Sequence, residues 1–311
     1  MWNTIDTFVP VQGLRGYGAD RGDGFLPTAQ PVTVIHYLAI SSCLVFLFLR
    51  FIMLKLLCLG DVVGTEGVSY LESGGRLRGL RTKYNADLVI VNGENSAEGN
   101  GISRDSAERL YDCGADIITG GNHTWKRREI CNMLDDGEYL IRPANYPASA
   151  AGMGYVIADV RGYRVLVMNV CGNVYMEPVT PPAEVAERIL KKESGRYDIA
   201  VCDIHAEATS EKMFFARYFD GKFSAVFGTH THVPTADICI LPGGTGYITD
   251  LGMCGSMNGI LGVKTESIVH KFTVRTPVLF EPAKGNCRIN GAYFEIDESS
   301  GKCTKAVRVE A

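Results

Sequence analysis

From residue 53 onward, short apolar runs alternate with stretches in which apolar residues recur at helical spacing. The apolar runs are bounded by glycine or polar residues and are short, which is typical of strands buried on both faces. They are residues 54–59, 87–91, 116–119, 198–202 and 224–227. The stretches that favour helices are residues 74–84, 103–114, 126–134, 183–192 and 210–218. This alternation predicts a largely parallel sheet that is covered by helices.

Turn and capping residues mark the ends of several of these elements. Ser103 is placed to cap the start of a helix, and Gly114 can adopt the left-handed conformation that ends one. Arg161 and Gly162 separate two apolar runs, 154–160 and 163–170, and predict a hairpin turn. After residue 236 short strands are expected to dominate, with residues 292–297 pairing with 305–309. We therefore expect one α/β domain with two packed sheets.

Residues 1–52 have a different pattern from the rest of the chain. The first thirty or so are rich in glycine, proline and short polar residues, and residues 32–52 form an apolar run about long enough to span a bilayer. Polar residues interrupt that run, and no basic cluster precedes it. Met53 directly precedes the first strand, so translation starting there would leave residues 53–311 as a cytoplasmic protein. A membrane anchor through 32–52 is the alternative.

Composition excludes several classes of protein. A net charge of −4 over 311 residues argues against an extended nucleic-acid surface, which usually shows an excess of lysine and arginine. The ten cysteines include no C-x-x-C pair, so a zinc ribbon or a thioredoxin-like site is not expected. We expect reduced, mostly buried thiols in a cytosolic enzyme.

Residue types that bind metals follow five of the predicted strands. The carboxyl ends of parallel strands share one edge of a sheet, so segments far apart in sequence can meet there. Carboxylate, amide and imidazole groups favour manganese, iron or zinc, and a carboxylate such as Glu94 can bridge two cations. The candidates are Asp61, Glu94, Asn95, Asn122, His123, His205, His230 and His232.

Each of these motifs also has a simpler interpretation. Asp61 alone could cap a helix, Glu94 and Asn95 could be turn residues, and a single histidine such as His205 is more often an interior residue. His230 and His232 are a sharper signal, because residues i and i+2 of an extended segment face the same side. The joint occurrence at successive strand ends favours a metal site. His36 and His270 lack such neighbours, and we expect no role for them.

Several segments resemble the YmdB-type branch of calcineurin-like metallophosphoesterases, and the resemblance runs from Met53 to the C-terminus. It implies a four-layer sandwich of two packed mixed β-sheets flanked by helices. It also implies a bacterial phosphodiesterase that acts on 2′,3′-cyclic nucleotides with two divalent or trivalent metal ions, iron or manganese above zinc. The segments are GDVVG (60–64), NGEN (92–95), GGNHTW (120–125), RPANYP (142–147), HAEATSEK (205–212), GTHTHVPTAD (228–237) and TDLGMCG (249–255).

The resemblance assigns roles to individual residues. One metal would be held by Asp61, Glu94, Asn95 and His232. The other would be held by Asn122, His205 and His230, with Glu94 bridging the two. His123 would protonate the leaving alkoxide or stabilise the transition state, which suits an imidazole.

The sequence departs from the family pattern at three places. Most calcineurin-like enzymes have D-x-H, but Val62 and Val63 follow Asp61, so Asn95 must replace that histidine. The pattern G-x-x-G-R is also absent, because Val68 stands where a basic residue is common. Substrate anchoring and subunit contacts on that side are therefore not expected to follow the family pattern. Pro234 replaces a usual glutamine.

The predicted function is hydrolysis of a small phosphodiester, such as a cyclic nucleotide or an RNA end, by a metal-activated hydroxide. A second interpretation is a non-catalytic, metal-dependent signalling or RNA-associated regulator, which would bind metal without turnover. A third is a nucleotide-binding module that uses GDVVGTEG as a phosphate loop, but that segment lacks the G-K-[ST] ending. The natural substrate and any homo-oligomeric state stay open.

Overall fold

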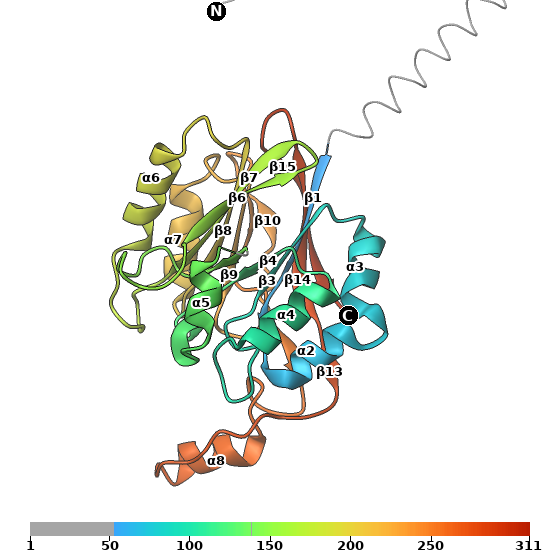
Figure 1. The fold of residues 1–311 in the computed structure, drawn as a ribbon, viewed down its shortest axis with the longest axis vertical. Coiled ribbons are helices and arrows are strands. Elements are labelled where there is room, and N and C mark those ends of the chain that lie inside the picture. Colours follow the sequence, from blue (N-terminus) through green and yellow to red (C-terminus); the bar gives the residue numbers. More distant parts are fainter. Residues whose placement is uncertain (1–52, 138) are drawn as a thin grey trace, which may run out of the picture. The chain divides into compact units, whose positions relative to one another are not determined.

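Two six-stranded mixed sheets form the centre of the structure, which is a computed structural model describing residues 53–137 and 139–311 (Figure 1). The first sheet has the order β15-β14-β1-β3-β4-β5, in which β1, β3, β4 and β5 are parallel. Its strands are β1 (Met53–Leu59), β3 (Leu88–Asn92), β4 (Ile117–Thr119), β5 (Leu140–Ile141), β14 (Asn290–Asp297) and β15 (Cys303–Glu310). The predicted pairing of the last two strands is confirmed, and it is antiparallel.

The second sheet has the order β10-β11-β9-β8-β7-β6, with β7, β8, β9 and β11 parallel. Its strands are β6 (Tyr155–Val160), β7 (Tyr163–Cys171), β8 (Ile199–His205), β9 (Ala225–Thr229), β10 (Cys239–Ile240) and β11 (Gly246–Ile248). A small third sheet joins β2 (Asp61–Val62), β12 (Met253–Ser256) and β13 (Cys287–Arg288).

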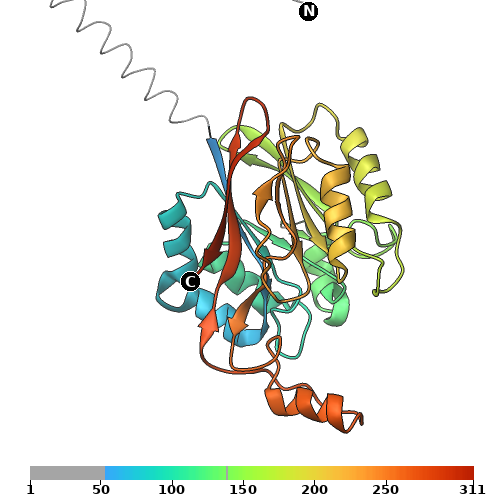
Figure 2. The ribbon, with the colours of Figure 1, turned by 180° about the vertical axis from the view of Figure 1, so that it is seen from behind.

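Helices cover the outer face of each large sheet (Figures 1 and 2). The first sheet packs against α2 (Gly64–Glu72), α3 (Arg76–Tyr84), α4 (Arg104–Cys113) and α5 (Ile130–Asp135). The second sheet packs against α6 (Pro182–Lys192) and α7 (Thr209–Tyr218). Short 3₁₀ helices occur at η1 (Ser73–Gly75) and η2 (Thr124–Lys126), and α8 (Thr265–Thr273) projects away from the sheets. The predicted four-layer sandwich is confirmed.

Strand β1 shows why its sequence is continuously apolar. Leu54, Leu56 and Cys58 face the second sheet, whereas Leu57 and Leu59 face the helices. Both faces of the strand are therefore removed from water, which is the condition that favours unbroken apolar runs over alternation. The same holds for β8 and β9, whose side chains are all buried.

The predicted caps and hairpin are confirmed. Ser103 accepts a hydrogen bond from the Ser106 amide at 3.1 Å, and Gly114 ends α4 with a φ of 117°. Arg161 and Gly162 both have positive φ angles, 58° and 87°, as a two-residue hairpin turn requires. All nine cysteines in the described part of the chain are free thiols, and six of them are buried.

Two helices differ from the expectation. Residues 74–84 were expected to form one helix, but Gly74 and Gly75 have positive φ angles and separate α3 from an additional helix, α2. Helix α8 lies where short strands were expected to dominate. Both sequences are weak helix formers, since α2 contains two glycines and α8 is rich in β-branched residues, and tertiary packing decides such cases.

The predictions for residues 1–52 lie outside the described residues, so the extension and the anchor through 32–52 stay predictions. Within 53–137 and 139–311, no helix combines the length and apolar character that a membrane span needs.

Candidate metal centre

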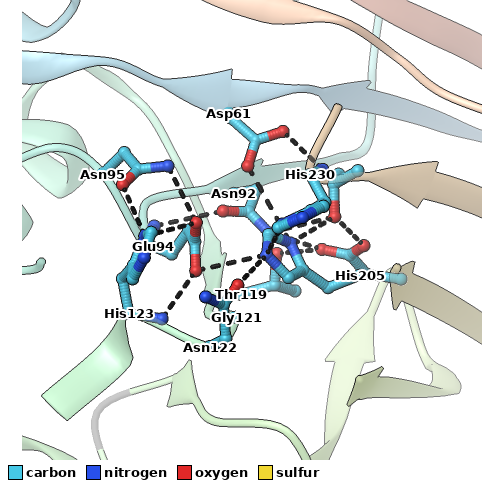
Figure 3. Close-up of polar contacts among 12 residues, drawn as sticks. Asp61, Asn92, Glu94, Asn95, Thr119, Gly121, Asn122, His123, His205 and His230 are labelled. Carbon is cyan, nitrogen blue, oxygen red and sulfur yellow. Dashed lines mark hydrogen bonds and ion pairs between the residues drawn. The ribbon is translucent and has the colours of Figure 1, made fainter. Parts of the chain in front are cut away.

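The predicted side chains meet at the carboxyl ends of strands from both large sheets (Figure 3). Asp61 lies in β2, Glu94 follows β3, and Asn122 follows β4. His205 is the last residue of β8, and His230 follows β9. The ligand atoms of Glu94, His205 and His230 all lie within 4.8 Å of one another.

Hydrogen bonds on the outer side of each imidazole determine which ring nitrogen faces inward. His205 Nδ1 lies 2.9 Å from Thr229 Oγ1, and His232 Nδ1 lies 3.1 Å from the Leu261 carbonyl oxygen. His230 Nε2 lies 3.0 Å from a carboxylate oxygen of Glu207. When the outer nitrogen of a neutral imidazole donates a hydrogen bond, the inner nitrogen carries a free lone pair. A hydrogen bond from the outer nitrogen is typical of histidines that bind metals.

The inward-facing atoms are mostly hydrogen-bond acceptors that lie close together. His205 Nε2 is 3.1 Å from His230 Nδ1, 3.0 Å from Asn122 Oδ1 and 3.2 Å from Glu94 Oε2. Asp61 Oδ1 is buried and has no hydrogen-bond partner among the described residues. A buried acceptor without a donor is costly, and a cation between such atoms would satisfy them. The residues therefore fit a metal centre.

Gly121 provides the space beside this cluster. A Cβ atom at this position would lie 2.2 Å from Glu94 Oε2 and 2.4 Å from His205 Nε2. Real Cβ contacts are never this short, so no larger residue fits without moving a candidate ligand. The backbone amide of His123, two residues later, donates to the same Glu94 oxygen at 2.9 Å.

Buried carboxylates and imidazoles shift one another's pKa values at the site. Burial raises the pKa of Asp61 and acts in the same direction on Glu94, but His205 and His123 hold the pKa of Glu94 well below its usual range. Burial lowers the pKa of His205, yet Glu94 and Asp61 outweigh it and raise the value to about 9. Burial and the neighbouring His205 lower the pKa of His230 to about 3. A second proton on His205, at Nε2, thus partly compensates the two carboxylates, and a cation bound by Nε2 would displace it.

Asp203 supports the centre from behind and was not assigned a role from the sequence. Its carboxylate accepts hydrogen bonds from Thr229 at 2.7 Å, Thr119 at 2.6 Å and Asn92 at 3.0 Å. These partners end β9, β4 and β3, so one buried carboxylate joins the two large sheets beneath His205. The sequence did hold a signal for this role. Asp203 stands two residues before His205 in the same strand, and residues i and i+2 of a strand share a face.

The loop that carries His230 and His232 was predicted incorrectly as an extended segment. Both residues have positive φ angles, 98° and 64°, which are uncommon outside glycine and occur often at functional sites. Between them, the Thr231 amide donates to Asp250 Oδ2 at 3.1 Å. The same oxygen accepts from Lys212 Nζ at 2.7 Å, and both side chains of this ion pair are buried.

Asn95 lies at the site, but its carboxamide faces the wrong way for ligation. Its Nδ2 atom lies 2.8 Å from Glu94 Oε1 and 3.2 Å from His232 Nε2, while its Oδ1 atom lies 3.1 Å from His123 Nδ1. To bind a cation together with His232, Asn95 would have to turn its Oδ1 atom toward His232. Exchange of the two amide atoms by a rotation of the side chain would achieve this.

A cavity of about 470 Å³ opens beside the cluster. Glu94, Asn95, His123, His230 and His232 line it, together with Glu207, which was not singled out from the sequence. The side chain of His123 is 28% exposed, so it is accessible to a molecule in the cavity.

The remaining predictions concern residues away from the centre. His270 lies on α8 and contacts Thr276, outside the site. Val68 is buried in α2, and Arg76 and Arg78 bond to backbone carbonyls and do not line the cavity. Pro234 packs against Gly252.

Comparison with known proteins adds independent information. The family model described as YmdB-like protein matches residues 57–309. A Bacillus subtilis protein named 2′,3′-cyclic-nucleotide 2′-phosphodiesterase is 41% identical over 256 residues, which cover 82% of this chain and 96% of that protein.

Two solved structures have the same fold. The crystal structure of a hypothetical protein from Thermus thermophilus has a TM-score of 0.78 and 37% identity, covering 83% of this chain and 99% of its own. The crystal structure of a novel phosphatase from Mycoplasma pneumoniae has a TM-score of 0.78 and 35% identity, covering 83% and 93%.

Proposed function

Because this chain belongs to the YmdB-like protein family, we propose that residues 53–311 form a di-metal phosphodiesterase that hydrolyses nucleoside 2′,3′-cyclic phosphates. The observation that carries the proposal is the set of inward-facing lone pairs around His205, which includes the unpartnered Asp61 Oδ1 and opens into a cavity. The name of the Bacillus subtilis relative supports the substrate class.

Two cation positions are proposed. Asn122, His205 and His230 would hold one, Asp61, Asn95 and His232 the other, and Glu94 would contact both. Oxygen and imidazole donors without thiolate suit iron or manganese. When bound, such cations lower the pKa of a coordinated water and offset charge on the phosphoryl oxygens.

His123 is placed to supply the proton that the leaving group needs. Hydrolysis consumes one water: its oxygen bonds to phosphorus, the bond from phosphorus to O2′ breaks, and O2′ leaves with a proton as the nucleoside 3′-phosphate forms. His123 Nδ1 is 3.1 Å from the side-chain amide of Asn95 and 3.3 Å from Glu94 Oε1, and either amide atom of Asn95 can bond to it, which leaves Nε2 for a ligand in the cavity. A histidine held in this way suits general acid catalysis.

Metal content and turnover measured together test this function. The purified full-length chain is expected to contain iron or manganese, to lose activity on chelation and to regain it when Mn²⁺ or Fe²⁺ is added. Adenosine 2′,3′-cyclic phosphate should be hydrolysed faster than the 3′,5′-cyclic isomer, measured by chromatography of the products. Bound metal with no turnover on any phosphodiester would favour the non-catalytic regulator.

Replacement of His123 separates proton donation from metal binding. His123→Ala is expected to keep the metal content, because the contact from residue 123 to Glu94 Oε2 is made by the backbone amide. It should lower kcat by about 10²–10⁴-fold with a nucleoside leaving group. The loss should be much smaller with nitrophenolate, which leaves without a proton. Equal losses for both leaving groups would contradict the role of proton donor.

A further inference from the structure

Part of the cavity is lined by residues on either side of α8, far along the chain from the candidate ligands that follow β3 and β4. Residues 260–263 lie beside residues 280–283, joined by an isolated β-bridge between Val263 and Pro282 and by a hydrogen bond from the Ala283 amide to the Gly262 carbonyl oxygen. A second bridge, Ile260 with Val263, closes the turn within residues 260–263. Leu261, Val263, Phe280 and Pro282 from this segment line the cavity. We name these four residues the apolar wall.

The apolar wall is joined directly to the metal centre. The carbonyl oxygen of Leu261 accepts the hydrogen bond from His232 Nδ1, and Leu261 itself has a φ of 53°. The side chains of Leu261 and Phe280 are each 47% exposed, although most large apolar residues of the domain are buried. Apolar side chains left open beside a polar cluster are typical of ligand sites.

Charge around the cavity limits what the apolar wall can receive. No lysine or arginine lines the cavity in the described part of the chain, and Glu207 adds an acidic group to its rim. Phosphate groups beyond the one at the cation positions would therefore find no cationic side chain, and would be repelled by Glu207. An uncharged, flat group fits this environment better.

We propose that the apolar wall is the subsite for the nucleobase of a single nucleotide and that Phe280 determines specificity by stacking on that base. This inference rests on the proposed function and adds which residues bind the base and why a single nucleotide is selected. A mononucleoside cyclic phosphate carries one phosphate for the candidate ligands and one uncharged aromatic group for the apolar wall, and both sets of residues line the same cavity.

The test compares two phenylalanines of the same segment on two substrates. Phe280→Ala is expected to raise KM for adenosine 2′,3′-cyclic phosphate about 10-fold, with kcat little changed, because stacking contributes equally to ground-state and transition-state binding. KM for ribose 2′,3′-cyclic phosphate, which has no base, should not change. Phe272→Ala is the matched control, because Phe272 is 74% exposed on α8 and does not line the cavity. Phe280→Tyr should restore KM.

Other outcomes would overturn the inference. An equal rise in KM for both substrates, or the same rise in Phe272→Ala, would assign the effect to the fold of the α8 segment. A KM for a dinucleotide ending in a 2′,3′-cyclic phosphate that is as low as that of the mononucleotide would exclude selection of a single nucleotide.

A binding measurement separates this inference from the proposed function. Calorimetry with adenosine 3′-monophosphate needs no turnover, and Phe280→Ala should weaken its binding about 10-fold. If the protein hydrolyses no phosphodiester but this loss is seen, the subsite stands and the phosphodiesterase assignment fails. If hydrolysis is seen and the binding of this nucleotide is unchanged in Phe280→Ala, the subsite is wrong and the proposed function stands.

Discussion

Replacement of His205 by alanine is expected to lower phosphodiesterase activity by about 100-fold or more, and to lower metal content with it. Replacement of residues that only support metal ligands costs about 10–100-fold, and a ligand at the centre of the site should cost at least the upper value. His205 Nε2 lies within 3.2 Å of three other candidate ligands. Metal content is measured by elemental analysis and activity on a 2′,3′-cyclic nucleotide.

His270→Ala serves as the control for this prediction, because His270 lies on α8 and its imidazole contacts Thr276, away from the candidate ligands. Its metal content and activity should equal those of the unsubstituted protein. Full metal content in His205→Ala with activity lost would show that His205 acts on the reaction without binding metal. Full activity in His205→Ala would contradict the assignment of the metal centre.

Loss of the Lys212–Asp250 ion pair is expected to produce the largest change in stability. Lys212 Nζ lies 2.7 Å from Asp250 Oδ2, both groups are buried, and Asp250 Oδ1 also accepts from the Gly252 amide at 2.8 Å. Asp250→Ala leaves a buried ammonium without a partner, which costs about 3–5 kcal/mol. Denaturant unfolding measures this loss. Glu108→Ala, which breaks the exposed pair with Arg104, should change stability little.

A double variant separates stability from placement of the histidine loop. Lys212→Met with Asp250→Leu replaces both charges by apolar groups, which is often neutral for stability. The Thr231 amide between His230 and His232 would lack its acceptor in this variant as in Asp250→Ala, so both variants should bind metal more weakly than the unsubstituted protein. Metal titration of the refolded variant measures this. Recovery of both stability and metal affinity would show that the ion pair has only a structural role.

Local sequence signals predicted the elements whose conformation depends on neighbouring residues. Ser103 and Gly114 bound α4 because a hydroxyl caps a helix start and glycine tolerates positive φ at its end. Arg161 and Gly162 form the expected hairpin turn. By contrast, α2 and α8 were missed, because their own sequences favour helix weakly and their packing environment is not visible in a local window.

The sequence by itself determined the α/β class and the chemistry of the site, because buried strands require apolar runs and the ends of parallel strands gather polar residues at one edge. Only the tertiary structure decided how those residues cooperate. The positive φ angles of His230 and His232, the cross-sheet contacts of Asp203 and the apolar wall around Phe280 depend on residues far apart in the chain. Such relations arise from packing between sheets and segments, and no local pattern of residues encodes their distances.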